Sequence, residues 1–442
     1  MKSTGLLVAA SLLLVLTGVV WWSNKKEAAA TKTETNAPLK ILSLDQSAVT
    51  SVGIREREQS SLILARDHDT WRITAPLPLA ADKEAVASLL STLSSLSSEH
   101  LIEDKASDLA PYGLADPPLV VTVTLKANQT KKLLIGDQTP AGNAYYAMLV
   151  GDPRVFTVAA YNKTSLEKTS NDLRDKRLLT ADFDKVSQIE LSNQKGGKTQ
   201  QTTFARNKDA WQIIKPISSR ANTEQVEELV RSLGDAKMDL SGPADAAGTA
   251  AAFASASPFA RAGVTGASGT EELEIRKAKD DYYAKSSAVP GVFKIAGARA
   301  TALDKSLDDF RNKKLFDFGY QDPDKIEIHS GPTSYFFTRS GSDWWGPDGK
   351  KLDESTVQTV VEKIRGLQAQ KFPDSGFTAP VLELRVTSAD GKRVERVLVA
   401  KHEDAYVAKR ENEPSLYQLA AKDIEDLEES CSKVKPSAAP KK

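Results

Sequence analysis

The sequence contains one unit written three times, and this repeat constrains the fold more than any other feature of the chain. A tryptophan five residues after an arginine marks each copy, at Trp71, Trp211 and Trp344. A stretch rich in β-branched or aromatic residues leads up to each arginine, which is typical of a β-strand. The spacing therefore predicts one common structural unit around each tryptophan.

A helix is predicted after each tryptophan. The apolar residues in this region recur with the same spacing in all three copies, as one stripe of a 3.6-residue helix does. The stripes are Val86, Leu89, Leu90, Leu93 and Leu96; Val226, Leu229, Val230, Leu233 and Ala236; and Val357, Val360, Val361, Ile364 and Leu367. Each stripe follows a residue suited to cap a helix N-terminus, namely Asp82, Asn222 or Asp353.

The second half of each copy also recurs. Matching stretches begin at Tyr145, Tyr282 and Tyr406, and a second matching stretch follows each of them. Short strands joined by tight turns pair in antiparallel fashion. The predicted fold class is therefore α+β: three tandem repeats of a mainly antiparallel sheet with helices packed on it, preceded by one N-terminal transmembrane helix.

The repeat predicts the domain boundaries. Module 1 is expected over residues 40–184, module 2 over 185–323 and module 3 over 324–430, with a disordered tail over 431–442. Residues 241–270 of module 2 are rich in Ala, Gly and Ser and replace a turn that copies one and three share in part. This composition predicts a mobile surface insertion.

The N-terminal residues predict a membrane anchor. Residues 5–22 carry no charge, and a helix of that length reaches roughly 27 Å, close to the thickness of the hydrocarbon core of a bilayer. We expect an anchor over 1–26 and a flexible spacer over 27–39; a signal peptide cleaved near residues 28–30 is the alternative. A slight positive excess before the segment predicts a single-pass protein of the bacterial cytoplasmic (inner) membrane, with its body outside the cytoplasm.

Composition argues against several function classes. Lys plus Arg and Asp plus Glu both number 59, which disfavours broad nucleic-acid binding. Cys431 is the only cysteine, so no disulfide framework or thiolate metal cluster is expected. The four histidines lack helical ligand spacing, and the "GGKT" stretch beginning at Gly196 precedes a predicted strand rather than a helix. The sequence thus predicts no catalytic residues, no cofactor and no metal site.

The repeated aromatic residues are the candidate site residues. They are Trp71, Trp211, Trp344, Tyr145, Tyr282 and Tyr406. A side chain that packs in the core of a repeated unit recurs with that unit, so core packing is the favoured interpretation. Contact with a ligand, such as stacking on a carbohydrate, is the alternative.

The first copy resembles a known bacterial family. The shared stretches are "WRITAP" from Trp71, "YGLADPP" from Tyr112 and "LLIGDQTPAGNAYYAML" from Leu133. In these the chain is similar to domain of unknown function 4340, over roughly residues 40–184. Copy two lacks the Tyr-Gly-Leu turn, and copy three keeps only Gly376 and Phe377 of it. Because members commonly carry one membrane segment and are encoded beside ABC-type transporters linked to gliding motility, the resemblance implies a transporter-associated envelope protein.

Two functional hypotheses follow. The first is a non-catalytic interaction or accessory subunit of a bacterial envelope or ABC-type transporter assembly, with protein partners and attachment to the bilayer through residues 5–22. The alternative is a cell-envelope enzyme or carbohydrate-binding protein with a site between modules. A pocket with converging carboxylates or exposed aromatic rings would favour the alternative.

Overall fold

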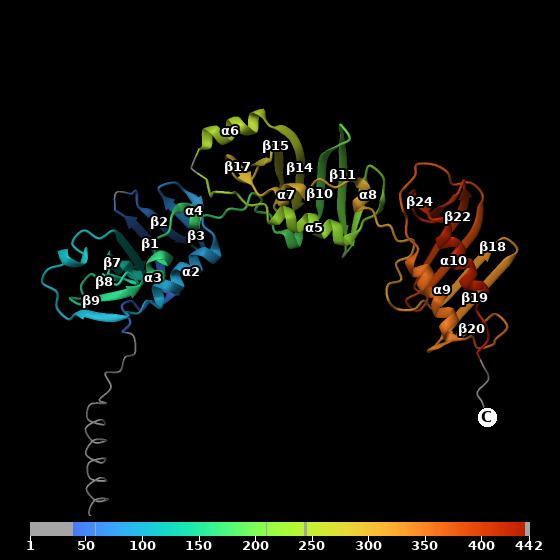
Figure 1. The fold of residues 1–442 in the computed structure, drawn as a ribbon, viewed down its shortest axis with the longest axis horizontal. Helices are drawn as coiled ribbons and strands as arrows, with labels where there is room; N and C mark the ends of the chain where they lie inside the picture. The colour runs from blue at the N-terminus through green and yellow to red at the C-terminus, as the bar shows by residue number, and fades with distance from the viewer. Residues whose placement is uncertain (1–38, 58, 209, 243–244, 438–442) are drawn as a thin grey trace, which may run out of the picture. The chain divides into compact units, whose positions relative to one another are not determined.

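The computed structural model describes residues 39–57, 59–208, 210–242 and 245–437 (Figure 1). They form three antiparallel sheets, one in each module. The chain divides into two compact units, Met1–Asp175 and Lys176–Lys442; the first holds module 1 and the second holds modules 2 and 3. The predicted α+β class and the threefold repeat are therefore confirmed.

Module 1 has a nine-stranded sheet in the order β4-β3-β2-β1-β6-β7-β8-β9-β5. Its strands are β1 (Val49–Glu56), β2 (Leu62–Asp67), β3 (Thr70–Ala75), β4 (Leu79–Ala80), β5 (His100–Glu103), β6 (Leu119–Leu125), β7 (Thr130–Gln138), β8 (Ala144–Leu149) and β9 (Val155–Ala159). Its α-helices are α2 (Lys83–Ser94), α3 (Ala160–Leu166) and α4 (Ser170–Leu173).

Module 2 repeats this topology with eight strands in the order β13-β12-β11-β10-β14-β15-β16-β17. The strands are β10 (Gln188–Lys195), β11 (Lys198–Asn207), β12 (Ala210–Lys215), β13 (Ser219–Arg220), β14 (Ser257–Gly266), β15 (Gly269–Ala278), β16 (Asp281–Ser286) and β17 (Val292–Ile295). The helices are α5 (Thr223–Gly234), α6 (Ala246–Ser255), α7 (Gly297–Thr301) and α8 (Leu307–Phe310).

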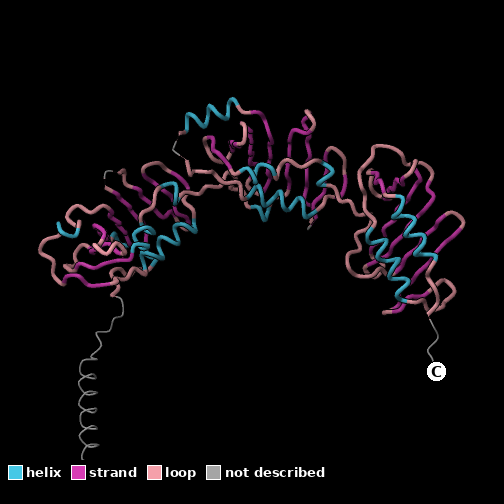
Figure 2. Tube along the Cα trace, viewed as in Figure 1, coloured by secondary structure: helices cyan, strands magenta, loops and turns pink. Residues whose placement is uncertain are grey.

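Module 3 repeats it with seven strands in the order β20-β19-β18-β21-β22-β23-β24. The strands are β18 (Lys325–Ser330), β19 (Thr333–Ser340), β20 (Asp343–Trp345), β21 (Pro380–Ser388), β22 (Arg393–His402), β23 (Ala405–Arg410) and β24 (Leu416–Leu419). The helices are α9 (Glu354–Gly366) and α10 (Ala421–Ser432). Figure 2 shows the helices and strands of each module along the chain trace.

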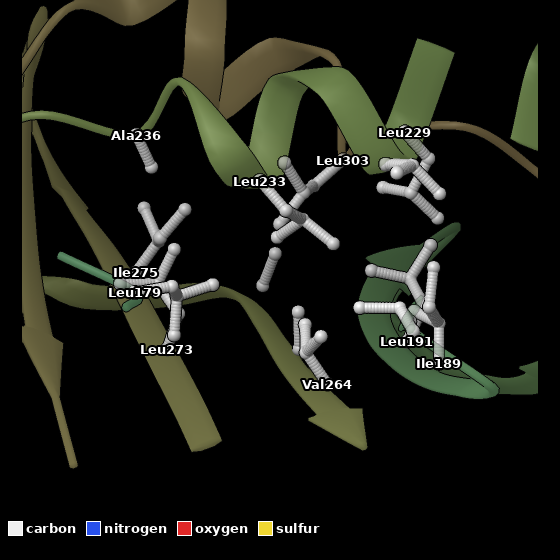
Figure 3. Packing of buried hydrophobic residues seen from close by; sticks show 14 of the residues in the cluster. Leu179, Ile189, Leu191, Leu229, Leu233, Ala236, Val264, Leu273, Ile275 and Leu303 are labelled. Atoms are coloured by element: carbon white, nitrogen blue, oxygen red, sulfur yellow. The ribbon is translucent and has the colours of Figure 1, made fainter. Parts of the chain in front are cut away.

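The helix stripe closes the core of each module. In module 2, Leu229 and Leu233 of α5 point toward Ile189 of β10, Val264 of β14 and Ile275 of β15 (Figure 3). The predicted cap residues are confirmed, because Asp82, Asn222 and Asp353 each accept hydrogen bonds from backbone N–H groups in the first helical turn. Burying such a stripe against one sheet face is the main stabilising contribution to a small α+β module.

The module boundaries lie earlier in the chain than predicted. The boundaries expected after residues 184 and 323 fall within the next core, because Leu178 and Leu315 already belong to the cores of modules 2 and 3. In all three modules the entering chain donates a backbone hydrogen bond to the residue that ends the helix stripe. The pairs are Ile41 with Leu96, Leu178 with Ala236, and Leu315 with Leu367.

The predicted disordered tail over 431–442 is wrong for its first residues. Cys431 lies in α10 and is 2% exposed. Pro436 then bridges to Leu352, just as Arg311 bridges to Ala221 at the end of module 2. Module 3 therefore closes in the same way as module 2, and residues 438–442 lie outside the described residues.

The predicted mobile insertion over 241–270 is also wrong for most of its length. Ala246–Ser255 form helix α6, and Ser257–Gly266 form β14, which pairs with β10 and β15. Alanine has the highest helix propensity, which suits the composition of α6. In β14 the buried residues Ala260, Ala262 and Val264 alternate with less buried ones, which is the ordinary pattern of a strand. The pattern is hard to recognise in the sequence because the buried side chains are small.

The predicted anchor over 1–26, and the spacer over 27–39 up to residue 38, lie outside the described residues. Among the residues that the structure describes, no helix combines the length and apolar character needed to span a bilayer.

Candidate binding site

The three tryptophans lie in β-hairpins, directly opposite their arginines. Trp71 pairs with Arg66, Trp211 with Arg206, and Trp344 with Arg339. The constant five-residue spacing is therefore a cross-strand pair around a tight turn. Trp211 and Trp344 are 2% and 1% exposed, whereas Trp71 is partly buried against the core of module 1.

The tryptophan of module 2 also joins its hairpin to the helix. Its indole Nε1 donates a 2.7 Å hydrogen bond to Oε1 of Glu227 in α5. The guanidinium of Arg206 lies 5.5 Å from the indole ring centre, and that of Arg66 lies 5.4 Å from Trp71. These cation–π contacts stabilise the hairpins modestly. The structure thus uses the landmark tryptophans for packing within the modules.

The three tyrosines likewise stay within their own modules. Tyr282 is 7% exposed and meets the ring of Phe259 edge-on, with 5.0 Å between the ring centres. Tyr145 and Tyr406 are partly buried against the cores of modules 1 and 3. Burial raises the pKa of the Tyr406 hydroxyl. The six candidate aromatics are therefore divided among three cores and do not converge on one pocket.

The Tyr-Gly-Leu turn of module 1 packs on a strand glycine. Gly113 has a φ of 64°, in the left-handed region that glycine tolerates. A Cβ on Gly136 of β7 would lie 2.1 Å from the carbonyl oxygen of Tyr112, so only glycine fits beneath the turn. In module 2, Arg276 stands at the position of Gly136, and its guanidinium lies 4.6 Å from the ring centre of Phe253 in α6. Helix α6 has therefore replaced the turn.

Module 1 has a groove beside α2 and α3. It has a volume of about 830 Å³, and six of its twelve lining residues are serines. Tyr161 of α3 stands in its wall with 71% of its surface exposed. Ser98 also lines the groove; it is only 4% exposed, and no described residue forms a hydrogen bond with its hydroxyl.

The same place is bridged by ion pairs in modules 2 and 3. There the first helix of the module is linked to the segment that follows the last strand. The pairs are Glu228 with Lys305 at 2.6 Å, Asp235 with Arg299 at 3.3 Å, and Asp426 with Lys363 at 2.9 Å. Each pair spans the gap between the two elements.

Module 1 has short neutral side chains at five of the six equivalent positions, and Lys168 keeps the charge of Lys305 at the sixth. The buried helix stripes, together with Leu166, Leu303 and Leu427, define which positions of the three copies are equivalent. The replacements, with module 1 first, are Ser88 for Glu228, Ser95 for Asp235, Thr92 for Lys363, Asn162 for Arg299 and Ser165 for Asp426. All five line the groove. The groove thus exists because charged bridging residues have given way to hydroxyl and amide groups.

Comparison with known families agrees with the landmarks described above. The profile of the family described as Domain of unknown function (DUF4340) matches residues 71–249 and 211–383. The chain belongs to the DUF4340 family. Each match begins at a module's tryptophan, so the family profile itself follows the repeat. A search of curated protein sequences gives no match.

One solved structure similar to this DUF4340 chain is a DnaN sliding clamp, DNA polymerase III subunit beta, from Pseudomonas aeruginosa bound to griselimycin. The two chains are 8% identical, with 85% of this chain and 91% of that chain covered, and the TM-score is 0.14. A similarity this weak carries no structural or functional argument.

Modules 2 and 3 of this DUF4340 chain meet through a charged cluster. Arg220 of β13 pairs with Asp317 and, at 2.6 Å, with Glu413; Tyr417 donates a hydrogen bond to Glu413. Burial works to raise the pKa of Asp317, but the charge and hydrogen bonds of Arg220 outweigh it and hold that pKa below its usual range. Burial raises the pKa of Tyr417 to about 12.

The carboxylates at this junction are matched by arginines. Besides Arg220, Arg410 pairs with Glu413 at 2.9 Å and with Glu395 at 3.1 Å. Converging carboxylates would favour an enzyme site, but mutual neutralisation is typical of a structural network. The hollow beside this cluster measures about 220 Å³.

The histidines lie apart from one another. His68 contacts Asp67 at 2.9 Å, His329 contacts Ser334 at 2.8 Å, and His100 lines the groove of module 1. Among the described residues, no cluster of three or more His, Cys, Asp or Glu side chains could hold a metal ion. Sequence reasoning missed the groove, although its signal was present as serine in one copy against charge in the others.

Proposed function

We propose that the protein is a non-catalytic binding protein of the bacterial envelope. Residues 5–22 attach it to the inner membrane, and the spacer carries the three modules on the extracytoplasmic side. Its protein partners are subunits of an ABC-type transporter assembly. The apolar length of residues 5–22 supports the attachment, and the resemblance described above supports the transporter.

One structural observation supports a binding role for this protein. Three modules keep one architecture and use their repeated aromatic residues for packing, yet module 1 replaces its bridging ion pairs by an open polar groove. A repeated scaffold that varies its surface in one copy is suited to recognition, because the core stays intact while the exposed chemistry changes. Tandem modules also increase avidity when several of them engage one assembly.

Crosslinking in membranes tests the partner. The full-length protein is treated with a mild lysine crosslinker in intact cells, and the adducts are identified by mass spectrometry. We expect adducts with transporter subunits, and a variant that lacks residues 1–26 should lose them. Adducts free of any transporter subunit would overturn the proposed assembly.

A reporter fusion tests the location. Alkaline phosphatase needs an oxidising compartment to form its disulfides, so a fusion after Lys442 should be active. The same fusion to a variant lacking residues 1–26 should be inactive, since nothing would direct it across the membrane. A full-length fusion that is well expressed and inactive would place the modules in the cytoplasm.

A further inference from the structure

The chemistry of the module 1 groove indicates the kind of ligand it can take. Serine and threonine hydroxyls both donate and accept hydrogen bonds, and an asparagine amide does the same with separate atoms. The side chains of Ser88, Ser91, Ser165 and Asn162 have no hydrogen-bond partner among the described residues, and the same holds for the buried Ser98. A ligand rich in hydroxyl groups matches such a surface, because each ligand hydroxyl can also donate and accept.

The charges of the residues that line the groove restrict the class of ligand further. Among the described residues, the groove is lined by no lysine or arginine, and Glu99 is its one carboxylate. Phosphate and carboxylate ligands are normally held by arginine, lysine or a helix N-terminus, so this lining disfavours anions. The equivalent places in modules 2 and 3 are charged, so neutrality is specific to module 1.

An exposed aromatic ring completes the groove. Tyr161 is 71% exposed, and Ala298 and Lys422 stand at the equivalent positions of the other two modules. A large exposed ring has no packing role in the module, whereas a flat apolar face next to hydroxyl groups suits the C–H face of a sugar ring. The aromatic residue and the neutral lining therefore occur together in one copy only.

We propose that the groove of module 1 binds a neutral oligosaccharide. Ser88, Ser95, Ser98 and Asn162 hydrogen-bond to sugar hydroxyls, and Tyr161 stacks against a sugar ring. This site goes beyond the proposed transporter role and does not depend on it. It lies inside one module, unlike the site between modules that the sequence suggested for a carbohydrate-binding protein.

Glycan binding by the full-length protein in lipid nanodiscs tests the site; glycoside detergents are avoided because they carry the probe chemistry. An array of neutral and anionic oligosaccharides is screened, with maltohexaose and chitohexaose among the neutral probes. The strongest neutral probe is then titrated by calorimetry, with inorganic phosphate as the anionic comparison. We expect a dissociation constant on the order of 1 mM or tighter for a neutral probe and no binding of phosphate.

Three variants locate the site. Tyr161→Ala should weaken binding of the neutral probe by roughly tenfold, from loss of the stacking face. The double variant Ser95→Asp/Asn162→Arg introduces the ion pair of module 2 and should abolish binding by bridging the groove. Tyr320→Ala removes a tyrosine of module 3 that is 98% exposed and should leave binding unchanged.

The binding measurements on the wild type and the three variants either support or overturn the proposed site. Binding that is lost in both groove variants and kept in Tyr320→Ala supports the site. Three results overturn it: no neutral probe bound by the wild type, equal binding by all variants, or a preference for phosphate. Because Tyr161 is exposed, its substitution tests the groove even if the double variant fails to fold. Crosslinking to transporter subunits is read separately, so failure of one proposal leaves the other measurable.

Discussion

Trp211 and Glu227 are joined by a 2.7 Å hydrogen bond from the indole to the carboxylate, and this bond ties the β11–β12 hairpin to α5. The indole is also 2% exposed, so it contributes both apolar burial and a satisfied polar group to module 2. Trp71 has the same place in module 1 but is only partly buried. The shared sequence motif therefore has unequal energetic importance in the two modules.

Trp211→Ala should destabilise module 2 by about 3–5 kcal/mol, because it removes a buried ring, leaves a cavity and takes away the indole N–H that Glu227 accepts from. Trp71→Ala is the matched control and should cost less. Hydrogen exchange read by mass spectrometry reports each module separately, and the loss of protection in Trp211→Ala should be confined to module 2. Equal protection in both variants and the wild type would contradict the assignment of Trp211 to the core.

Gly136→Ala should destabilise module 1 by about 1–3 kcal/mol, since the new methyl group would overlap the Tyr112 carbonyl and push the turn off β7. Gly53→Ala in β1 is the control: its Cβ would lie 3.8 Å from the nearest atom, an ordinary contact. That control should be neutral or slightly stabilising. Urea unfolding of both variants measures the two changes in stability. If Gly136→Ala leaves the free energy of unfolding unchanged, the Tyr-Gly-Leu turn does not pack on β7 as described.

The sequence predicts the repeated parts of this fold well, for a physical reason. A helix stripe and its cap are local patterns: Val86 to Leu93 lie on the helix as predicted and Asp82 caps it, while Leu96 is buried just beyond the helix end at Ser94. The segment from Ala246 to Gly266 escaped prediction because its small residues carry little hydrophobic contrast, so a real helix and strand resemble a loop. The boundary at Leu178 was missed because the contact that defines it, to Ala236, is distant in sequence.

The groove of module 1 could not be predicted from the sequence for a different reason. Ser88 and Asn162 are 74 positions apart in the chain, and only the packing of α2 beside α3 brings them into one surface. Aligning the three copies would have shown neutral residues in place of charges. It would not have shown that these positions face one another, because an ion pair such as Asp235 with Arg299 is visible only in three dimensions.

The junction of modules 2 and 3 should weaken in acid. Because Arg220 lowers the pKa of Asp317 below the ordinary 3.8, the stability that this pair contributes is present above pH 3.8 and is lost as pH falls through the lower folded pKa. Asp317→Asn should therefore be less stable than the wild type at neutral pH, and the difference should shrink toward pH 2. Urea midpoints at several pH values check this, and a gap that stays constant with pH would contradict the pairing.

Cys431 should report the unfolding of module 3. It is the only cysteine and is 2% exposed, and burial raises the pKa of its thiol to about 12. Because the thiolate is the reactive form, a disulfide reagent such as DTNB should react very slowly with the native protein and rapidly once module 3 opens. Trp344→Ala removes a ring that is 1% exposed in the same core, so it should destabilise module 3. Each 1.4 kcal/mol of lost stability raises the population of the open form about tenfold, so the reaction of Cys431 at neutral pH should be at least about tenfold faster than in the wild type. Trp211→Ala lies in a different core and should leave the rate near that of the wild type. Rapid labelling of the native wild type, or equal acceleration by both substitutions, would show that module 3 does not close around Cys431 as an independent core.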